Sequence, residues 1–149
     1  MIREYRNTDW PGVEALYKRS LAEWLDLSKY PMAVFADINA PLTENEILLS
    51  VVNANDAGEI NGLIIAGGFI GNTLFVYDFY VVPELRGTAI PGRMYAMFES
   101  LAVAKGYERI IFETSQYHKD FIGLLDRTGC KLCKLQFAKE LNHGRTQST

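Results

Sequence analysis

An acidic side chain interrupts the most strongly apolar run of this chain. Asp78 lies in the middle of residues 74–80, and the other residues of this run are aliphatic or aromatic. A carboxylate in such a run is expected to be partly removed from water, which raises its pKa and makes it a better base. Asp78 is therefore a candidate general base. The alternative is a structural carboxylate that bonds a neighbouring loop.

The same run leads into a glycine-containing loop and then into a helix. Residues 78–87 predict the end of a buried strand and a loop, and Pro91 marks the first turn of the helix that follows. Backbone N–H groups and the helix dipole at such a junction favour an anion such as phosphate. Many junctions of this kind bind nothing, so the segment alone leaves both interpretations open.

The remaining elements predict a mixed α/β layer around this segment. Strands are predicted over 2–6, 47–54, 60–70, 74–82, 109–114 and 132–141, and helices over 10–24, 32–38, 91–105 and 118–128. The three strands between residues 47 and 82 are separated by turn signals, which predicts an antiparallel meander. The strand at 109–114 follows a strand–helix crossover and should lie parallel to the strand at 74–82.

Cap and turn residues indicate where these elements begin and end. Thr8 or Asp9 is the predicted N-cap of the first helix, and Gly106 is predicted to end the third. Gly67 and Gly68 interrupt the strand at 60–70, which indicates a bulge or a close approach to the backbone. One domain is predicted over residues 1–141, followed by a polar tail at 142–149.

The loop after the acid-bearing strand resembles a known family. Residues 82–87, with the sequence Val-Pro-Glu-Leu-Arg-Gly, are similar to the acetyl-CoA site of the GNAT acetyltransferase superfamily, whose pattern is Arg/Gln-x-x-Gly-x-Gly/Ala. Residues 105–110 and 127–130 and the order of elements are similar to the family as well. The resemblance implies a mixed α+β, GNAT-like fold. Its central sheet would be mostly antiparallel, with a parallel, splayed pair of strands at the cofactor cleft and helices on both faces.

The resemblance also implies acetyl-CoA as the acyl donor, lying between the two splayed strands. Backbone groups near the end of the first strand would bond the pantetheine and the acetyl carbonyl, and loop amides would hold the pyrophosphate. The residues implied as cofactor-binding are Val81, Val82, Arg86, Gly87, Thr88, Ala89, Ile90, Gly92 and Arg93.

Two residues of the loop depart from the family pattern. Ala89 replaces the first glycine, and its Cβ hinders a close approach of phosphate. Pro91 replaces the second small residue and lacks an N–H. Gly92 and Arg93 are the residues that would compensate, with an amide and a positive charge.

The proton donor is also changed relative to the family. The usual general acid is a tyrosine four residues before the last helix-ending glycine, and that position is Leu125 here. Tyr117 and Tyr80 are candidate substitutes, and protonation by solvent is an alternative. His118 falls where the family often has an asparagine that contacts CoA. It is a candidate hydrogen-bond donor or base, or it only caps the helix.

These features together predict an acetyl-CoA-dependent N-acetyltransferase. A small amine or a protein amine would attack the thioester directly, with a base to remove its proton. The alternative is a GNAT-fold protein that has lost transferase activity and serves as a binding or structural component. Tyr30, Met32 and Phe35 would edge the acceptor side by resemblance, or belong to the core.

Composition excludes several other classes. The 149 residues are 48% hydrophobic and carry a formal charge of −3 with a pI of about 5.4, which argues against a general nucleic-acid binder. No apolar run predicts a membrane span or a signal peptide, so a cytoplasmic location is expected, and a homodimer is compatible with the sequence. Cys130 and Cys133 are predicted on opposite faces of a strand, as reduced thiols without a metal.

Overall fold

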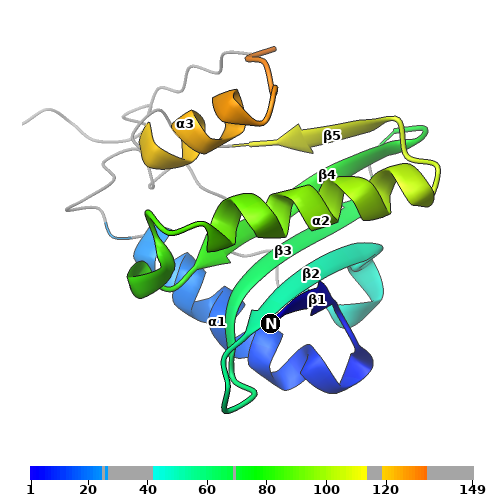
Figure 1. Ribbon diagram of the computed structural model, residues 1–149. Coiled ribbons are helices and arrows are strands. Elements are labelled where there is room, and N and C mark those ends of the chain that lie inside the picture. The colour runs from blue at the N-terminus through cyan, green and yellow to red at the C-terminus, as the bar shows by residue number, and fades with distance from the viewer. Residues whose placement is uncertain (25, 27–41, 69, 114–118, 134–149) are drawn as a thin grey trace, which may run out of the picture.

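In the computed structural model, a five-stranded sheet carries helices on both of its faces (Figure 1). The structure describes residues 1–24, 26, 42–68, 70–113 and 119–133. In chain order the elements are β1 (Ile2–Glu4), η1 (Asn7–Asp9), α1 (Trp10–Trp24), η3 (Glu44–Glu46), β2 (Leu49–Ala54), β3 (Ile60–Gly68), β4 (Thr73–Val81), η4 (Pro83–Leu85), α2 (Ile90–Ala104), β5 (Arg109–Phe112) and α3 (Lys119–Arg127). The predicted mixed α+β class is confirmed.

The strands follow one another across the sheet in the order β1-β2-β3-β4-β5. The first four are antiparallel neighbours, and β5 pairs parallel to β4 because α2 carries the chain back across the sheet. Parallel pairing runs from Thr73↔Arg109 to Val76↔Phe112. Residues 77–81 of β4 extend beyond the last pair, so the two strands are joined only at one end.

Two hydrophobic clusters hold helices against opposite faces of the sheet. In Figure 1 α2 crosses in front of the sheet and α1 lies behind it. The cluster under α2 consists of Leu49, Val51, Ile64, Ala66, Leu74, Val76, Val81, Met94, Tyr95, Phe98 and Ala102. The cluster under α1 consists of Val13, Leu16, Val52, Leu63, Ile65 and Tyr80. The α3 helix lies beside α2. There the centre of the Phe121 ring is 5.5 Å from the centre of the Phe79 ring and 6.1 Å from that of Phe112.

A β-bulge in β4 changes which face its residues occupy. Ile65 of β3 pairs with Asp78 and Ala66 pairs with Val76, so Tyr77 is an extra residue on β4. Before the bulge Val76 lies in the cluster under α2, whereas after it Asp78 and Tyr80 lie on the α1 side. Two residues apart on a regular strand, Val76 and Asp78 would share a face. The bulge therefore turns Asp78 toward α1.

The glycine pair of β3 has the close approach that the sequence indicates. A Cβ on Gly67 would lie 2.3 Å from the hydroxyl oxygen of Tyr77, because the tyrosine ring lies across the glycine. The bulged residue itself is Tyr77 on the partner strand, opposite the step from Ile65 to Ala66 rather than opposite the glycines. A side chain at position 67 would therefore displace the Tyr77 ring from its place across β3.

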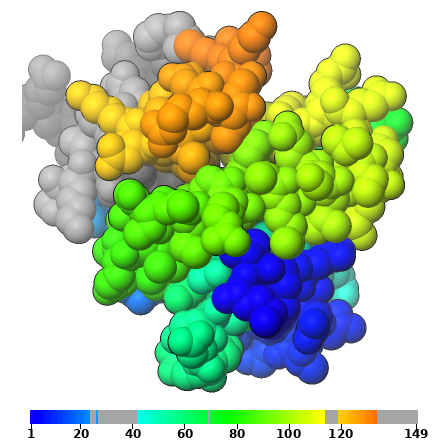
Figure 2. Space-filling view, in the orientation of Figure 1, coloured from blue at the N-terminus to red at the C-terminus, as the bar shows by residue number. Residues whose placement is uncertain are grey.

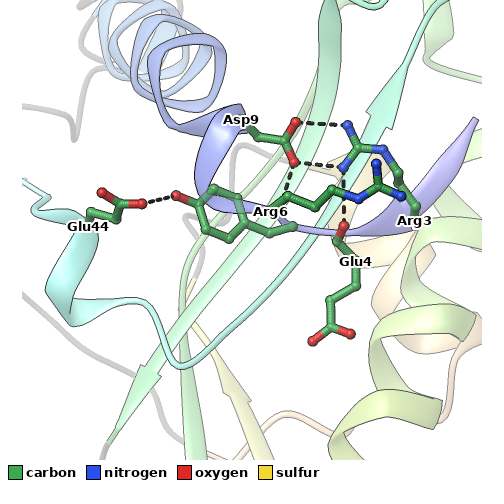
Figure 3. Close-up of polar contacts among 6 residues, drawn as sticks. Arg3, Glu4, Arg6, Asp9 and Glu44 are labelled. Atoms are coloured by element: carbon green, nitrogen blue, oxygen red, sulfur yellow. Dashed lines mark hydrogen bonds and ion pairs between the residues drawn. The ribbon is translucent and has the colours of Figure 1, made fainter.

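Asp9 stabilises the start of α1 in a different way from the predicted N-cap. Its carboxylate bonds backward, to the Arg6 amide at 2.8 Å and to two guanidinium nitrogens of Arg3 at 2.6 and 2.8 Å (Figure 3). This bidentate pair ties β1 to the residue that directly precedes α1. At the other predicted boundary, Gly106 follows the last residues of α2 with φ of +86° and ends that helix.

The predicted last strand is partly wrong. Leu132 and Cys133 have no strand conformation, and Cys130 lies in the turn after α3, so the expected placement of the two cysteines on opposite strand faces is corrected. Both are free thiols. Residues 134–141, the helix expected at 32–38 and the tail at 142–149 lie outside the described residues. No helix in the described ranges is long and apolar enough to cross a membrane.

Candidate active site

Asp78 lies where β4 leaves its pairing with β5. It follows two residues after Val76, which makes the last parallel pair, and it stands opposite Ile65 of β3. The residue is only 8% exposed. Its Oδ2 atom has no hydrogen-bond partner in the part of the chain that the structure describes. A buried carboxyl oxygen without a partner is uncommon, and it is free to take a proton.

The surroundings of Asp78 favour its protonated form. Burial raises the pKa of this carboxyl from its ordinary 3.8 to about 7, and the negative charge of Glu23 adds to the increase. The nearby Ser20 hydroxyl and the Phe79 amide act in the opposite direction. Ser20 is fully buried and lies one turn before Glu23 on α1. A carboxyl with a pKa near 7 is suited to accept a proton at neutral pH.

A hydrogen-bonded cluster beside Asp78 joins α1 to the end of β4. The Tyr80 hydroxyl donates to Glu23 Oε2 at 2.7 Å. Arg86 Nη1 and Nη2 donate to the two Glu23 oxygens at 2.7 and 2.9 Å. Burial and the bond to Glu23 raise the pKa of Tyr80 to about 12, so this hydroxyl keeps its proton at neutral pH. The cluster holds one carboxylate by three hydrogen bonds.

The Arg86 side chain also contacts the end of β4, the strand that precedes it. Its Nε and Nη2 atoms donate to the Val81 carbonyl, each at 3.3 Å, and its guanidinium carbon lies 5.2 Å from the centre of the Tyr80 ring. The Val82 amide donates to Asn61 of β3 at 3.0 Å. Since successive backbone groups alternate in direction, the Val81 carbonyl points away from β3, toward the edge where β5 no longer pairs.

The turn between η4 and α2 is exposed and presents backbone N–H groups. Gly87 has φ of +77°, a conformation that disfavours other residue types. The Thr88 hydroxyl accepts a hydrogen bond from the Ile90 amide at 3.3 Å. The amides of Gly87, Ala89 and Gly92 have no acceptor among the described residues. In Figure 2 this turn stands at the surface at the left end of α2.

These groups fit a phosphate-bearing ligand. Three N–H groups and the positive end of the α2 dipole lie together, and Arg93 is exposed in the first turn of the helix. A Cβ on Gly87 or Gly92 would meet no atom within 4 Å, so the backbone is open to a ligand there. Pro91 lies in the first turn, where it contributes no donor. Arg86 differs from the others, because its guanidinium is turned back toward Glu23.

The predicted proton donors have different outcomes. Leu125 is buried, so the family's tyrosine position holds an apolar core side chain. Tyr80 lies close to Asp78 on β4, with its hydroxyl held by Glu23. Tyr117 and His118 lie outside the described residues, and their roles stay predictions.

Sequence reasoning missed the two α1 residues of the site, Ser20 and Glu23. Ser20 lies four residues after Leu16, within the apolar stripe of α1, and a small polar residue in such a stripe was an available signal. Glu23 had no local signal, because its partners Tyr80 and Arg86 are 57 and 63 positions away.

A hollow lies at the end of α2 away from the turn at Gly87. It has a volume of about 250 Å³ and is lined by the last turns of α2, the start of β5 and the turn after α3. Tyr95 and Cys130 face each other there, with Oη and Sγ 3.9 Å apart.

Within the described ranges no three histidine, cysteine or acidic side chains gather in a way that would hold a metal ion.

Several solved structures with a similar arrangement of elements are described as acetyltransferases. No model of a protein family and no curated protein matches the sequence. The aminoglycoside N-acetyltransferase AAC(6')-Iy in complex with CoA is 16% identical, with a TM-score of 0.65 over 95% of this chain and 99% of that chain. The putative acetyltransferase YycN from Bacillus subtilis is 15% identical, with a TM-score of 0.67 over 95% and 98%.

A third similar structure carries the family name. The GNAT family N-acetyltransferase YhbS from Escherichia coli, in complex with CoA, is 17% identical, with a TM-score of 0.58 over 83% of this chain and 67% of that chain. At these identities the likeness concerns the fold. With its mostly antiparallel sheet, its parallel β4–β5 pair and its helices on both faces, the chain has the fold of the GNAT acetyltransferases.

Proposed function

We propose that this protein is an acetyl-CoA-dependent N-acetyltransferase in which an acceptor amine attacks the thioester directly. The observation that carries the proposal is the placement of Asp78. It is a buried carboxyl with a pKa of about 7, two residues beyond the last β4–β5 pair and on the strand that leads into the exposed turn before α2. A proton acceptor and a phosphate-binding turn thus belong to one strand–turn–helix unit.

The residues of the turn would hold the donor. The amides of Gly87, Ala89 and Gly92 and the Arg93 side chain would bind its phosphates. Acetyl-CoA would supply the activated thioester carbonyl. The open edge of β4 near Val81 and Val82 would lie along the pantetheine arm, as the resemblance implies.

Asp78 would do the proton work on the acceptor. Most amines are ammonium ions at neutral pH and cannot attack a carbonyl until they lose a proton. A carboxylate with a pKa near 7 takes that proton far more effectively than an exposed carboxylate with a pKa near 4. The acceptor is an amine of small-molecule or protein origin. Solvent or Tyr117 would protonate the departing thiolate.

Acetyl transfer is tested by following CoA release with a thiol reagent across a panel of amines, with wild-type protein and Asp78→Asn. We expect Asp78→Asn to lower kcat/KM by about 10²–10⁴ while CoA still binds. Asp56→Asn, in the exposed β2–β3 turn, is the matched control and should behave as wild type.

Thermal unfolding with and without acetyl-CoA tests the donor separately. A ligand of the native state must raise the unfolding temperature. If saturating acetyl-CoA leaves it unchanged, the transferase proposal is wrong, and the alternative of a binding or structural protein with this fold takes its place.

A further inference from the structure

Arg86 occupies the first position of the turn motif that the resemblance assigns to the cofactor's pyrophosphate, yet its side chain is directed elsewhere. All three guanidinium nitrogens donate hydrogen bonds within the protein. Their acceptors are the Glu23 carboxylate on α1 and the Val81 carbonyl at the end of β4. The side chain therefore runs back from the turn, toward the α1 face.

The geometry of this contact is the one for which arginine is suited. Two N–H···O bonds of 2.7 and 2.9 Å join the guanidinium of Arg86 to the two Glu23 oxygens. The other N–H groups of the same planar guanidinium donate to the Val81 carbonyl. The Tyr80 ring beneath the guanidinium adds a cation–π contact at 5.2 Å. An isolated surface ion pair contributes little, but this pair is bidentate and belongs to a network.

The same cluster determines where the last turn of α1 stands relative to Asp78. Ser20 and Glu23 lie one turn apart on the face of α1 that meets β4, and Asp78 and Tyr80 lie on the facing side of β4. A shift of Glu23 would move a negative charge relative to Asp78. A shift of Arg86 would release the Val81 carbonyl at the edge where β4 no longer pairs with β5.

We propose that Arg86 is a positioning residue of the transferase site, which braces Glu23 against the end of β4 and does not serve as a ligand of the cofactor's pyrophosphate. This inference rests on the proposed function. To reach a phosphate at the α2 N-terminus, the guanidinium would have to give up its bonds to Glu23 and to the Val81 carbonyl. The free amides of the turn already provide donors for that anion.

Arg86→Lys separates the two roles, because lysine binds phosphate as a point charge but cannot make the bidentate brace. We expect both Arg86→Lys and Arg86→Gln to lower kcat by about 10–100-fold, since a small misplacement of reacting groups has effects of this size. The KM for acetyl-CoA and the Kd for CoA should change less than about threefold. Arg93→Gln is the matched control in the same segment and should instead raise the KM for acetyl-CoA.

Glu23→Gln completes the test. It should lower kcat to a similar extent, and the double variant with Arg86→Gln should be no worse than either single variant, because both changes break one unit. It should also move the acidic limb of kcat/KM to lower pH, because Glu23 no longer raises the pKa of Asp78, and a purely structural role would not do so.

The inference is overturned if Arg86→Lys keeps wild-type kcat and CoA affinity while Arg86→Gln raises the Kd for CoA tenfold or more. It is also overturned if the unfolding midpoints of the Arg86 and Glu23 variants are strictly additive. This comparison of thermal unfolding midpoints among the wild type, the two single variants and the double variant forms a double-mutant cycle that does not depend on enzyme activity. A wild-type protein that does not bind CoA would refute the proposed function, and the cycle would still decide whether the brace exists.

Discussion

Replacing Asp78 with asparagine should change the pH dependence of folding in a direction opposite to that of most acidic residues. The folded carboxyl has a pKa of about 7, whereas in the unfolded chain it ionises near its ordinary 3.8. Below pH 4 the group is protonated in both states and has no effect. As the pH rises from 4 to 7, only the unfolded state is ionised, so the free energy of unfolding of the wild type falls. Above pH 7 this penalty is constant.

The size of the effect follows from the two pKa values. At about 1.4 kcal/mol per pH unit, the interval from 3.8 to about 7 corresponds to about 4 kcal/mol. This is an upper figure, because water that enters beside the ionised carboxylate reduces the penalty. An asparagine amide left unpaired in the site costs about 1–3 kcal/mol, but that cost is the same at every pH. The quantity to compare is therefore the pH dependence of the difference between the two proteins.

Urea unfolding of the wild type and Asp78→Asn between pH 4 and pH 8.5 measures this difference. We expect the variant to gain stability relative to the wild type as the pH rises, by about 2–4 kcal/mol in total, with half of the change reached at about pH 5.4 and a plateau above about pH 7. A difference that stays constant over this range would refute the reasoning. It would show that Asp78 is an ordinary hydrogen-bonded carboxylate, which is the structural alternative that the sequence leaves open.

Two further predictions concern other parts of the fold. Asp9→Asn should destabilise the protein at neutral pH, because the hydrogen bonds from Arg3 hold the pKa of Asp9 below its usual range. Urea unfolding should show that the variant has lost about 1.5–3 kcal/mol of stability at pH 7. This difference should disappear below pH 3.8, where the wild type loses the same contribution as Asp9 is protonated. Gly92→Ala should stabilise the ligand-free protein by about 0.5–1 kcal/mol in thermal unfolding, because Gly92 lies in α2 with open space around its Cα, while the KM for acetyl-CoA rises severalfold.

The elements that local patterns specify were predictable from the sequence. The apolar spacing of α1, the turn signals around β3 and Gly106 after α2 each act within a few residues, and the parallel β4–β5 pair follows from the handedness of the crossover. The acid in the middle of an apolar strand was recognisable for the same reason, because its neighbours in sequence already indicate burial.

The orientation of the site depends on contacts between distant residues and could not be predicted. Nothing near Arg86 in the sequence indicates that it closes on Glu23, and the family pattern points it toward the cofactor instead. The cap expected at Asp9 failed similarly, because Arg3 on β1 and the Arg6 amide both donate to this carboxylate and direct it away from the helix. In each case a long-range or bidentate partner outweighs a local preference.

The bulge at Tyr77 means that the direction of Asp78 is encoded by a count of residues rather than by any residue type. Adding one residue to β3 opposite Tyr77 would leave every side chain of the site in the sequence, yet it would restore regular alternation along β4 and place Asp78 on the same face of the sheet as Val76. Tyr80, two positions further, would turn with it, away from Glu23. Two relatives with the same site residues, one with this bulge and one without it, would therefore carry the acid on opposite sides of the sheet.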